Sequence, residues 1–302
     1  MIHRYSAFVT AALFASAAYG ASVLAPGSDE ELVPTGKGWG QRSAPGKVAP
    51  RAKPVGSSGI LYHGGPLLSS PNVYFIWYGN WSGNDATTIL THLAGSIGGS
   101  PYFNINTTYS DGNGTAVINV VNYAGSTSDD GYSQGTALSD AGVEGVVAGA
   151  ISGGKLPADS KGVYFVLTSA DVNETSGFCT QYCGWHGHGT IFGADTKYAF
   201  VGNPDRCPGA CEAQATGPNG NAGADGMASI VAHELEETVT DPNLNAWYDR
   251  RGEENADKCA WTYGTIYRTS NGAYANMKLA GHDYLIQRNW ANASAGYCAL
   301  SY

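Results

Sequence analysis

The chain is organised around one stretch, Met227-Ala-Ser-Ile-Val-Ala-His-Glu-Leu-Glu-Glu-Thr-Val-Thr-Asp-Pro242. Its apolar residues recur at roughly helical spacing, which predicts a partly buried helix with an N-cap at Asp225 and an end at Pro242. Residues four apart share one face of a helix, so His233 and Glu237 point the same way. A His-Glu-x-x-His helix uses this geometry to give two ligands to zinc, and here Glu237 replaces the second histidine.

His233 and Glu237 are therefore candidate ligands for a divalent metal, for which we expect zinc. Glu234 is the candidate catalytic base, which would take a proton from the attacking water. A carboxylate in place of an imidazole makes the site harder and less selective for zinc. The competing interpretation is an ordinary amphipathic helix with an acidic solvent face and one incidental histidine.

A third ligand is expected downstream of the helix, where zinc peptidases with an acidic third ligand carry it. Glu254 lies 21 residues after His233 and Asp257 lies 24 after it, and either completes a site with one open position for water. We favour Asp257 slightly. Asp249 is a further option, and Asp241 is better suited to a helix end or turn. The competing interpretation is a solvated acidic loop near a disulfide.

Residues 1–20 have the parts of a secretory signal peptide: a basic start, an apolar run and a small-x-small exit before cleavage after Gly20. Neither this run nor any later segment approaches the roughly 18 apolar residues of a membrane helix. We therefore expect a secreted, extracellular protein. Residues 21–56 are rich in Pro, Gly, Ser and Lys and are predicted to be a disordered leader, either a pro-segment or a spacer. Residues 57–302 are long enough for one globular domain.

Six cysteines, all in the second half of the chain, indicate disulfides formed in an oxidising compartment. We expect Cys259 to pair with Cys298 and the two C-x3-C units to cross-link their loops, in a pairing that the sequence does not choose. The alternative is a zinc-ribbon-like cage with His186 and His188, against which secretion argues. The cysteines are Cys179, Cys183, Cys207, Cys211, Cys259 and Cys298.

Charge and sequons describe the surface. A net charge of −9, 14% charged residues and no Lys/Arg run give no electrostatic footprint for nucleic acid or an anionic membrane, so neither is expected as a partner. Five N-x-Ser/Thr sequons predict surface loops that a glycosylating host would modify, some of them matching by chance. They lie at Asn80, Asn106, Asn113, Asn173 and Asn292.

Strand and helix patterns alternate through the domain. They predict an α/β (α+β) fold in which a central twisted mixed sheet has flanking helices and the His233 helix packs against it, as in zincin-type peptidases. Amphipathic stretches predict helices that open at Asn84 and Ser139. The predicted strands are residues 72–78, 115–121, 162–168 and 197–201.

Three further side chains are weaker candidates. His186 and His188, in Gly184-Trp-His-Gly-His-Gly189, could supply a metal ligand or stabilise an oxyanion, but a structural Ω-like loop is the preferred interpretation. Tyr248 could donate a hydrogen bond to a tetrahedral intermediate, although packing is its more frequent role.

Several of these stretches resemble the EXORDIUM, or phosphate-induced protein, family. The resemblance begins at Ser58-Gly-Ile-Leu-Tyr-His-Gly-Gly-Pro-Leu-Leu68 and runs in order to Cys298, with all six cysteines at the family's positions. Other matching stretches are Phe178-Cys-Thr-Gln-Tyr-Cys-Gly-Trp-His-Gly187, Cys207-Pro-Gly-Ala-Cys211, His233-Glu-Leu-Glu-Glu237 and Ala256-Asp-Lys-Cys259.

The resemblance implies an apoplastic or cell-wall-associated protein, linked in plants to growth and cell expansion, whose biochemical activity is not settled. Many members are similar in carrying His-Glu-Leu-x-Glu at residues 233–237, while others lack it. Thr240-Asp-Pro242 departs from the family's Ser-Asn-Pro, and residues 252–259 are less apolar than in the family, yet Glu254 and Asp257 stay in register.

Two classes of function follow. The first is a metal-dependent, peptidase-like hydrolase acting on a peptide or cell-wall substrate. The second is a non-catalytic extracellular protein of growth or signalling, in which the motif is structural or vestigial. An open coordination position facing a cleft favours the first class, and a closed site favours the second.

Overall fold

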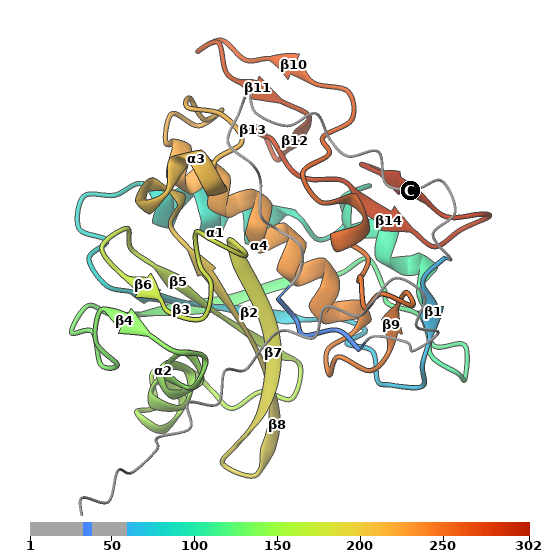
Figure 1. Cartoon of the computed structure of the whole chain (residues 1–302), viewed down its shortest axis with the longest axis horizontal. Coiled ribbons are helices and arrows are strands. Elements are labelled where there is room, and N and C mark those ends of the chain that lie inside the picture. Colours follow the sequence, from blue (N-terminus) through green and yellow to red (C-terminus); the bar gives the residue numbers. More distant parts are fainter. Residues whose placement is uncertain (1–32, 38–58) are drawn as a thin grey trace, which may run out of the picture. The chain divides into compact units, whose positions relative to one another are not determined.

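The computed structural model describes residues 33–37 and 59–302, so the predicted signal peptide and most of the predicted leader lie outside the described residues (Figure 1). The central sheet has five strands: β2 (Asn72–Tyr78), β3 (Asn122–Asp129), β5 (Gly162–Thr168), β7 (Gly184–Ile191) and β8 (Ala194–Gly202). Their order is β3-β2-β5-β8-β7. β7 pairs antiparallel with β8 and the other pairs are parallel, which confirms the predicted central mixed sheet.

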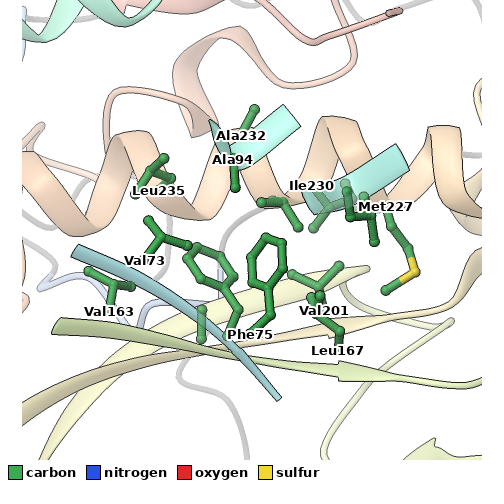
Figure 2. Packing of buried hydrophobic residues seen from close by; sticks show 14 of the residues in the cluster. Val73, Phe75, Ala94, Val163, Leu167, Val201, Met227, Ile230, Ala232 and Leu235 are labelled. Carbon is green, nitrogen blue, oxygen red and sulfur yellow. The ribbon is translucent and has the colours of Figure 1, made fainter. Parts of the chain in front are cut away.

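Helices cover both faces of this sheet (Figure 1). The helices α1 (Ala86–Ser96) and α4 (Ala222–Thr240) pack together on one face, and α2 (Asp140–Ser152) packs on the other. Figure 2 shows apolar side chains of β2, β5 and β8 meeting those of α4, among them Phe75, Leu167, Ile230 and Leu235. Each such side chain contributes about 1.5–3 kcal/mol when it is fully buried. This apolar layer holds α4 in place on the sheet.

The helix ends follow from side-chain caps and from proline. Ser139 caps α2 as predicted, since its Oγ accepts the N–H of Gly142. The predicted cap of α4 at Asp225 is wrong, because the helix begins one turn earlier at Asn221, whose Oδ1 accepts the N–H of Ala224 at 3.0 Å. The helix ends at Thr240, two residues before proline, as expected of a chain that cannot continue helically there.

One strand prediction and one loop prediction fail for physical reasons. Residues 115–121 form no strand, and the following polar segment, β3, pairs with β2 instead. β3 is an edge strand with alternately exposed residues, so it does not need an apolar sequence. The predicted Ω-like loop at residues 184–189 is wrong as well, because these residues form the edge strand β7. Pairing with β8 overrides the low strand propensity of its glycines.

Short elements complete the described chain. No helix in residues 33–37 and 59–302 is long and apolar enough to cross a membrane. The two-stranded pairs are β1 (Leu61–Tyr62) with β9 (Trp247–Tyr248), β4 (Ala137–Leu138) with β6 (Asn173–Glu174), β10 (Tyr267–Arg268) with β11 (Tyr274–Ala275), β12 (Met277–Leu279) with β13 (His282–Tyr284), and β14 (Asn289–Ala291) with β15 (Tyr297–Ala299). The remaining helices are α3 (Pro208–Cys211) and the 3-10 turns Phe103–Thr108, Pro204–Arg206 and Asp257–Cys259.

Three disulfides fasten the second half of the chain. Cys259 pairs with Cys298 as predicted, and the two C-x3-C units are cross-linked to each other. The zinc-ribbon-like cage is wrong, because all six cysteines lie in the described part of the chain and none is free. The cross-linking pairs tie the residues just before β7 to those around α3, just after β8. They are Cys179 with Cys207 and Cys183 with Cys211.

One of the predicted surface sequons is buried. The Asn106 side chain is wholly inaccessible and donates a hydrogen bond to the Phe103 carbonyl at 3.2 Å, so the folded protein does not offer it for glycosylation. Asn80 and Asn113 are exposed, as the sequence predicts.

β7 approaches α4 closely at Gly184, where no side chain fits between them. A Cβ at Gly184 would lie 2.5 Å from Ile230 Cγ2 and 2.8 Å from the Phe200 carbonyl oxygen. Three residues along the same strand, a Cβ at Gly187 would find its nearest neighbour at an ordinary 3.7 Å, in the ring of Trp185. Glycine is therefore required at the first position and dispensable at the second.

We expect Gly184→Ala to lower the free energy of unfolding by about 1–3 kcal/mol, because the added methyl group overpacks the contact between β7 and α4. Gly187→Ala is the matched control and should change it by less than about 0.5 kcal/mol. Urea unfolding with the disulfides intact measures both. Equal effects of the two substitutions would contradict the close approach.

Candidate functional site

The last two turns of α4 hold the predicted motif, buried beneath the sheet. His233 and Glu237 are one turn apart, and His233 Nε2 lies 3.1 Å from Glu237 Oε1. Glu234, Glu236 and Glu237 are all buried. The interpretation of this stretch as an amphipathic helix with an acidic solvent face is therefore wrong.

Asp257 returns to this pair from the 3-10 turn that follows the helix in sequence. Its Oδ1 lies 3.5 Å from His233 Nε2, and its backbone N–H donates to Glu237 Oε1 at 3.0 Å. The structure thus brings together the imidazole and the two carboxylates that the sequence singled out as first choices. Asp257 is 2% exposed, so the segment is not a solvated acidic loop.

A second group lies on the other side of Glu237. His186 Nε2, on β7, lies 3.2 Å from both carboxylate oxygens of Glu254 and 3.7 Å from Glu237 Oε2. Glu254 is thus at the site, but it approaches His186 rather than His233. The two oxygens of Glu237 face two different histidines, so one carboxylate joins the groups His233/Glu237/Asp257 and His186/Glu237/Glu254.

The spacing of the first group fits a small divalent ion. Four ligands held tetrahedrally at 2.0–2.1 Å lie about 3.3 Å from one another. The separations from His233 Nε2 to Glu237 and Asp257, 3.1 and 3.5 Å, bracket that value. On the side of the second group, Glu237 Oε2 faces His186 and accepts no hydrogen bond within the described residues, although Glu237 is wholly buried. A buried carboxylate oxygen without a donor is costly, and a cation supplies what it lacks.

Glu234, the predicted base, lies where β7 crosses the helix. Its Oε1 is 3.1 Å from the point that a Cβ of Gly184 would occupy, so glycine makes room for this carboxylate. Its Oε2 accepts no hydrogen bond from the described residues. Burial, together with the nearby charges of Glu237 and Asp257, raises the pKa of Glu234 well above its usual range. A carboxylate of raised pKa is suited to take and return a proton near neutral pH.

Burial has opposite effects on His186 and Glu237. Burial lowers the pKa of His186 to about 3, against an opposing effect of the Asp257 charge. Burial and the charge of Asp257 raise the pKa of Glu237 to about 7. His186 is therefore a neutral imidazole at pH 7, which is the form that binds metals.

His233 carries the compensating positive charge. Burial acts most strongly and lowers its pKa, but the charges of Glu237 and Glu234 and the hydrogen bonds to Asp257 and Glu237 together outweigh burial and raise the pKa of His233 well above its usual range. Burial and the charge of Glu237 raise the pKa of Glu254 as well. A divalent ion that replaced the proton of His233 would take over its role as counter-charge, so its binding would release protons.

The two other predicted acidic ligands lie outside both groups. Asp241 Oδ1 accepts the N–H groups of Asn245 and Ala246, each at 2.6 Å, so it is the turn residue that its position suggested. Asp249 forms a buried ion pair with Lys258 at 2.7 Å. Both carboxylates therefore have structural partners.

Of the three weaker candidates, two lie outside the cluster and one belongs to it. His188 pairs with Asp195 at 2.8 Å, outside both His-carboxylate groups, and Tyr248 stacks on His63 with ring centroids 3.7 Å apart. His186, by contrast, belongs to the cluster and was undervalued by the sequence analysis. The signal for it was the run from Gly184 to Gly189, whose small residues permit the close packing of a strand.

We expect stability to depend on pH through His186. The folded pKa of about 3 lies below the ordinary value of 6.5, so below pH 6.5 the unfolded chain binds more protons and the contribution of this group to stability is lost as pH falls. With a chelator present, the free energy of unfolding of the wild type should fall by about 2 kcal/mol more than that of His186→Gln between pH 6.5 and pH 5. Denaturant titrations at several pH values measure the difference, and His188→Gln controls for loss of a histidine on the same strand. Parallel profiles of wild type and His186→Gln would contradict the neutral, buried imidazole.

Comparisons with known proteins agree on one family. Residues 60–298 match the family described as "Phosphate-induced protein 1 conserved region". The chain is 34% identical to Protein EXORDIUM-like 5 of Arabidopsis thaliana over 281 residues, covering 78% of this chain and 77% of that protein. It is 32% identical to Protein EXORDIUM-like 3 of the same plant, covering 80% and 84%.

A relative from another plant is Protein PHOSPHATE-INDUCED 1 of Nicotiana tabacum, 28% identical over 41% of this chain and 50% of that protein. No solved structure matches. The family match, together with the two long alignments, is consistent with an extracellular protein. The chain belongs to the phosphate-induced protein 1, or EXORDIUM, family.

Proposed function

We propose that the buried cluster binds a divalent metal ion, zinc by preference, and forms the centre of a peptidase-like hydrolase. The observation that carries the proposal is the convergence of His233, Glu237 and Asp257 at distances that suit one small ion. Each of the three is buried and titratable, and such groups gather at functional sites. The substrate class is a peptide or a cell-wall polymer.

Each side chain has a separate task in this proposal. His233, Glu237 and Asp257 hold the ion, which supplies Lewis-acid polarisation of the scissile carbonyl. Glu234 takes a proton from the attacking water and returns it to the leaving group, which its raised pKa favours. His186 and Glu254 lie beside the second oxygen of Glu237 and fix its orientation, as outer groups do at metal sites.

Burial favours a second candidate function. His233 is 4% exposed and Glu237 wholly inaccessible, whereas a catalytic ion needs a position open to substrate. With no such opening, the ion or the hydrogen bonds alone would be structural. The protein would then be a non-catalytic extracellular protein of growth or signalling.

Metal content tests the site itself. Elemental analysis of the secreted protein, purified without chelator, should give about one divalent ion per chain. His233→Ala and Glu237→Ala should lose it, because each removes a ligand, while His188→Ala should retain it as the matched control. Two ions per chain would extend the site to His186 and Glu254. No ion in the parent protein would overturn the proposal.

Glu234→Gln separates catalysis from metal binding. We expect this variant to keep its ion and to lose cleavage of a mixed-sequence peptide library by about 10²–10⁴-fold, since only the proton acceptor is removed. Glu236→Gln is the control, because Glu236 accepts a hydrogen bond from Asn289 at 2.5 Å and takes no part in either metal group. Mass spectrometry of the library products measures cleavage by both variants. An ion-loaded parent that cleaves nothing would favour the structural role.

A further inference from the structure

The segment Val33–Lys37 lies along the free edge of β7. The Gly36 carbonyl accepts the backbone N–H of His186 at 3.0 Å, which is the kind of bond that an added strand makes. Pro34 and Gly36 are buried. The other edge of β7 is paired with β8, so this segment covers the side on which the sheet ends.

The contact is made by backbone alone at Gly36. This residue has a φ of +68°, and a Cβ there would lie 1.9 Å from the His186 carbonyl oxygen. Leu244, in the turn after α4, would be 3.4 Å from that Cβ. Gly36 therefore fits into a narrow place between the strand edge and the turn, which no other residue can enter in this conformation.

The next side chain, Lys37, lies on the other face of the sheet, in a partly exposed site formed by Asp140, Ser176, Tyr182 and Trp185 that we call the lysine pocket. Its Nζ pairs with Asp140 Oδ2 at 2.5 Å and donates to Ser176 Oγ at 2.7 Å. The ammonium also lies 5.5 Å from the ring centre of Tyr182 and 5.4 Å from that of Trp185. A carboxylate, a hydroxyl and two aromatic faces make a site that selects a cation with an apolar stem.

This pocket is held in shape by its own hydrogen bonds. Ser176 Oγ lies 2.6 Å from Asp140 Oδ1 and 2.7 Å from Glu174 Oε1, and the hydroxyl of Tyr182 donates to the buried Glu174. Asp140 stands in the first turn of α2, directly after the cap Ser139. The pocket is thus built from α2, β6, β7 and the loop between β6 and β7, and hydrogen bonds other than those of Lys37 connect its side chains.

Successive residues of β7 point to opposite faces of the sheet, which links the pocket to the cluster. His186 points to α4 and joins Glu237 and Glu254, while Trp185 packs on Tyr198 and points to the side of Lys37. A chain extended along this edge therefore passes from the cluster to the lysine pocket within one or two residues.

We propose that the edge of β7 is a binding site for an extended peptide, with the pocket of Asp140, Ser176, Tyr182 and Trp185 selecting a lysine side chain. Val33–Lys37 fills this site in cis and keeps other peptides out. Binding rests on the contacts above and needs no metal. That the bound peptide is also a substrate rests, in addition, on the proposed hydrolase function.

The test is a binding titration of the full chain, in chelator, with a fluorescent peptide of the sequence Val-Pro-Thr-Gly-Lys. Gly36→Ala, which places a methyl group against His186, and Lys37→Ala, which empties the pocket, should each bind the peptide at least about tenfold more tightly than the wild type. Val33→Ala should behave like the wild type, because Val33 is 62% exposed. Adding Asp140→Asn to either displaced variant should remove the gain.

The same titration contains the results that would overturn the proposal. These are equal binding by all variants, no binding by any, or equal binding of a peptide with alanine in place of its lysine. Because neither metal nor turnover enters the assay, a failure of the hydrolase function leaves its outcome unchanged.

Hydrogen exchange gives a second measurement that does not depend on a peptide. The amide of His186 donates to Gly36 in the wild type, so displacing the segment should speed its exchange at least about tenfold in Lys37→Ala. The amide of Cys179, which donates to the Tyr182 carbonyl near the pocket, should exchange unchanged and so report that the fold is intact. Unaltered exchange at His186 would show that the segment does not depend on its lysine.

Discussion

The close approach of β7 to α4 at Gly184 is the contact on which the cluster depends. His186 lies two residues along the strand from this glycine, and Glu234 and Glu237 lie on the helix it touches. Any larger residue at position 184 would push the strand and the helix apart. A contact of about 3 Å between their side chains would not survive this displacement. The separation between His186 and Glu237 therefore depends on a packing contact as well as on the interaction between their own side chains.

Burial of the cluster costs the fold free energy. Two imidazoles and four carboxylates lie in a region where the described side chains are nearly inaccessible, and removing such groups from water costs several kcal/mol per charge. His186 limits this cost by staying neutral, and His233 limits it by holding a proton. A domain with an extensive aromatic and aliphatic core does not need this arrangement for stability, and for this reason the cluster is the candidate site.

The parts of this site that were predictable are those encoded locally. The spacing of His233 and Glu237 follows from the helical repeat, and Asp257 lies on the first segment that can return to the helix. The glycine run around His186 indicated close packing, but its role in the cluster was not predictable, because it depends on how β7, paired with β8, packs against α4. The same holds for β3, whose polar sequence becomes a strand only beside β2.

Errors at the ends of elements have a simpler origin. Asn221 and Asp225 are both good helix caps, and one turn separates them, so the choice was made by the contacts of the folded chain. Asp225 instead accepts a hydrogen bond from Asn219. Glu254 and Asp257 are also close in the sequence, three residues apart. The bend of the chain between them brings Glu254 to His186 and Asp257 to His233.

The three disulfides also determine which donor atoms the folded protein can offer. A reduced chain would present six thiols, and thiolates compete strongly with imidazole and carboxylate for soft divalent ions. Once every cysteine is paired, the candidate ligands in the described chain are nitrogen and oxygen atoms gathered around Glu237. Pairing of the cysteines therefore removes the softest ligands from the folded protein and leaves any ion to the harder set of donors.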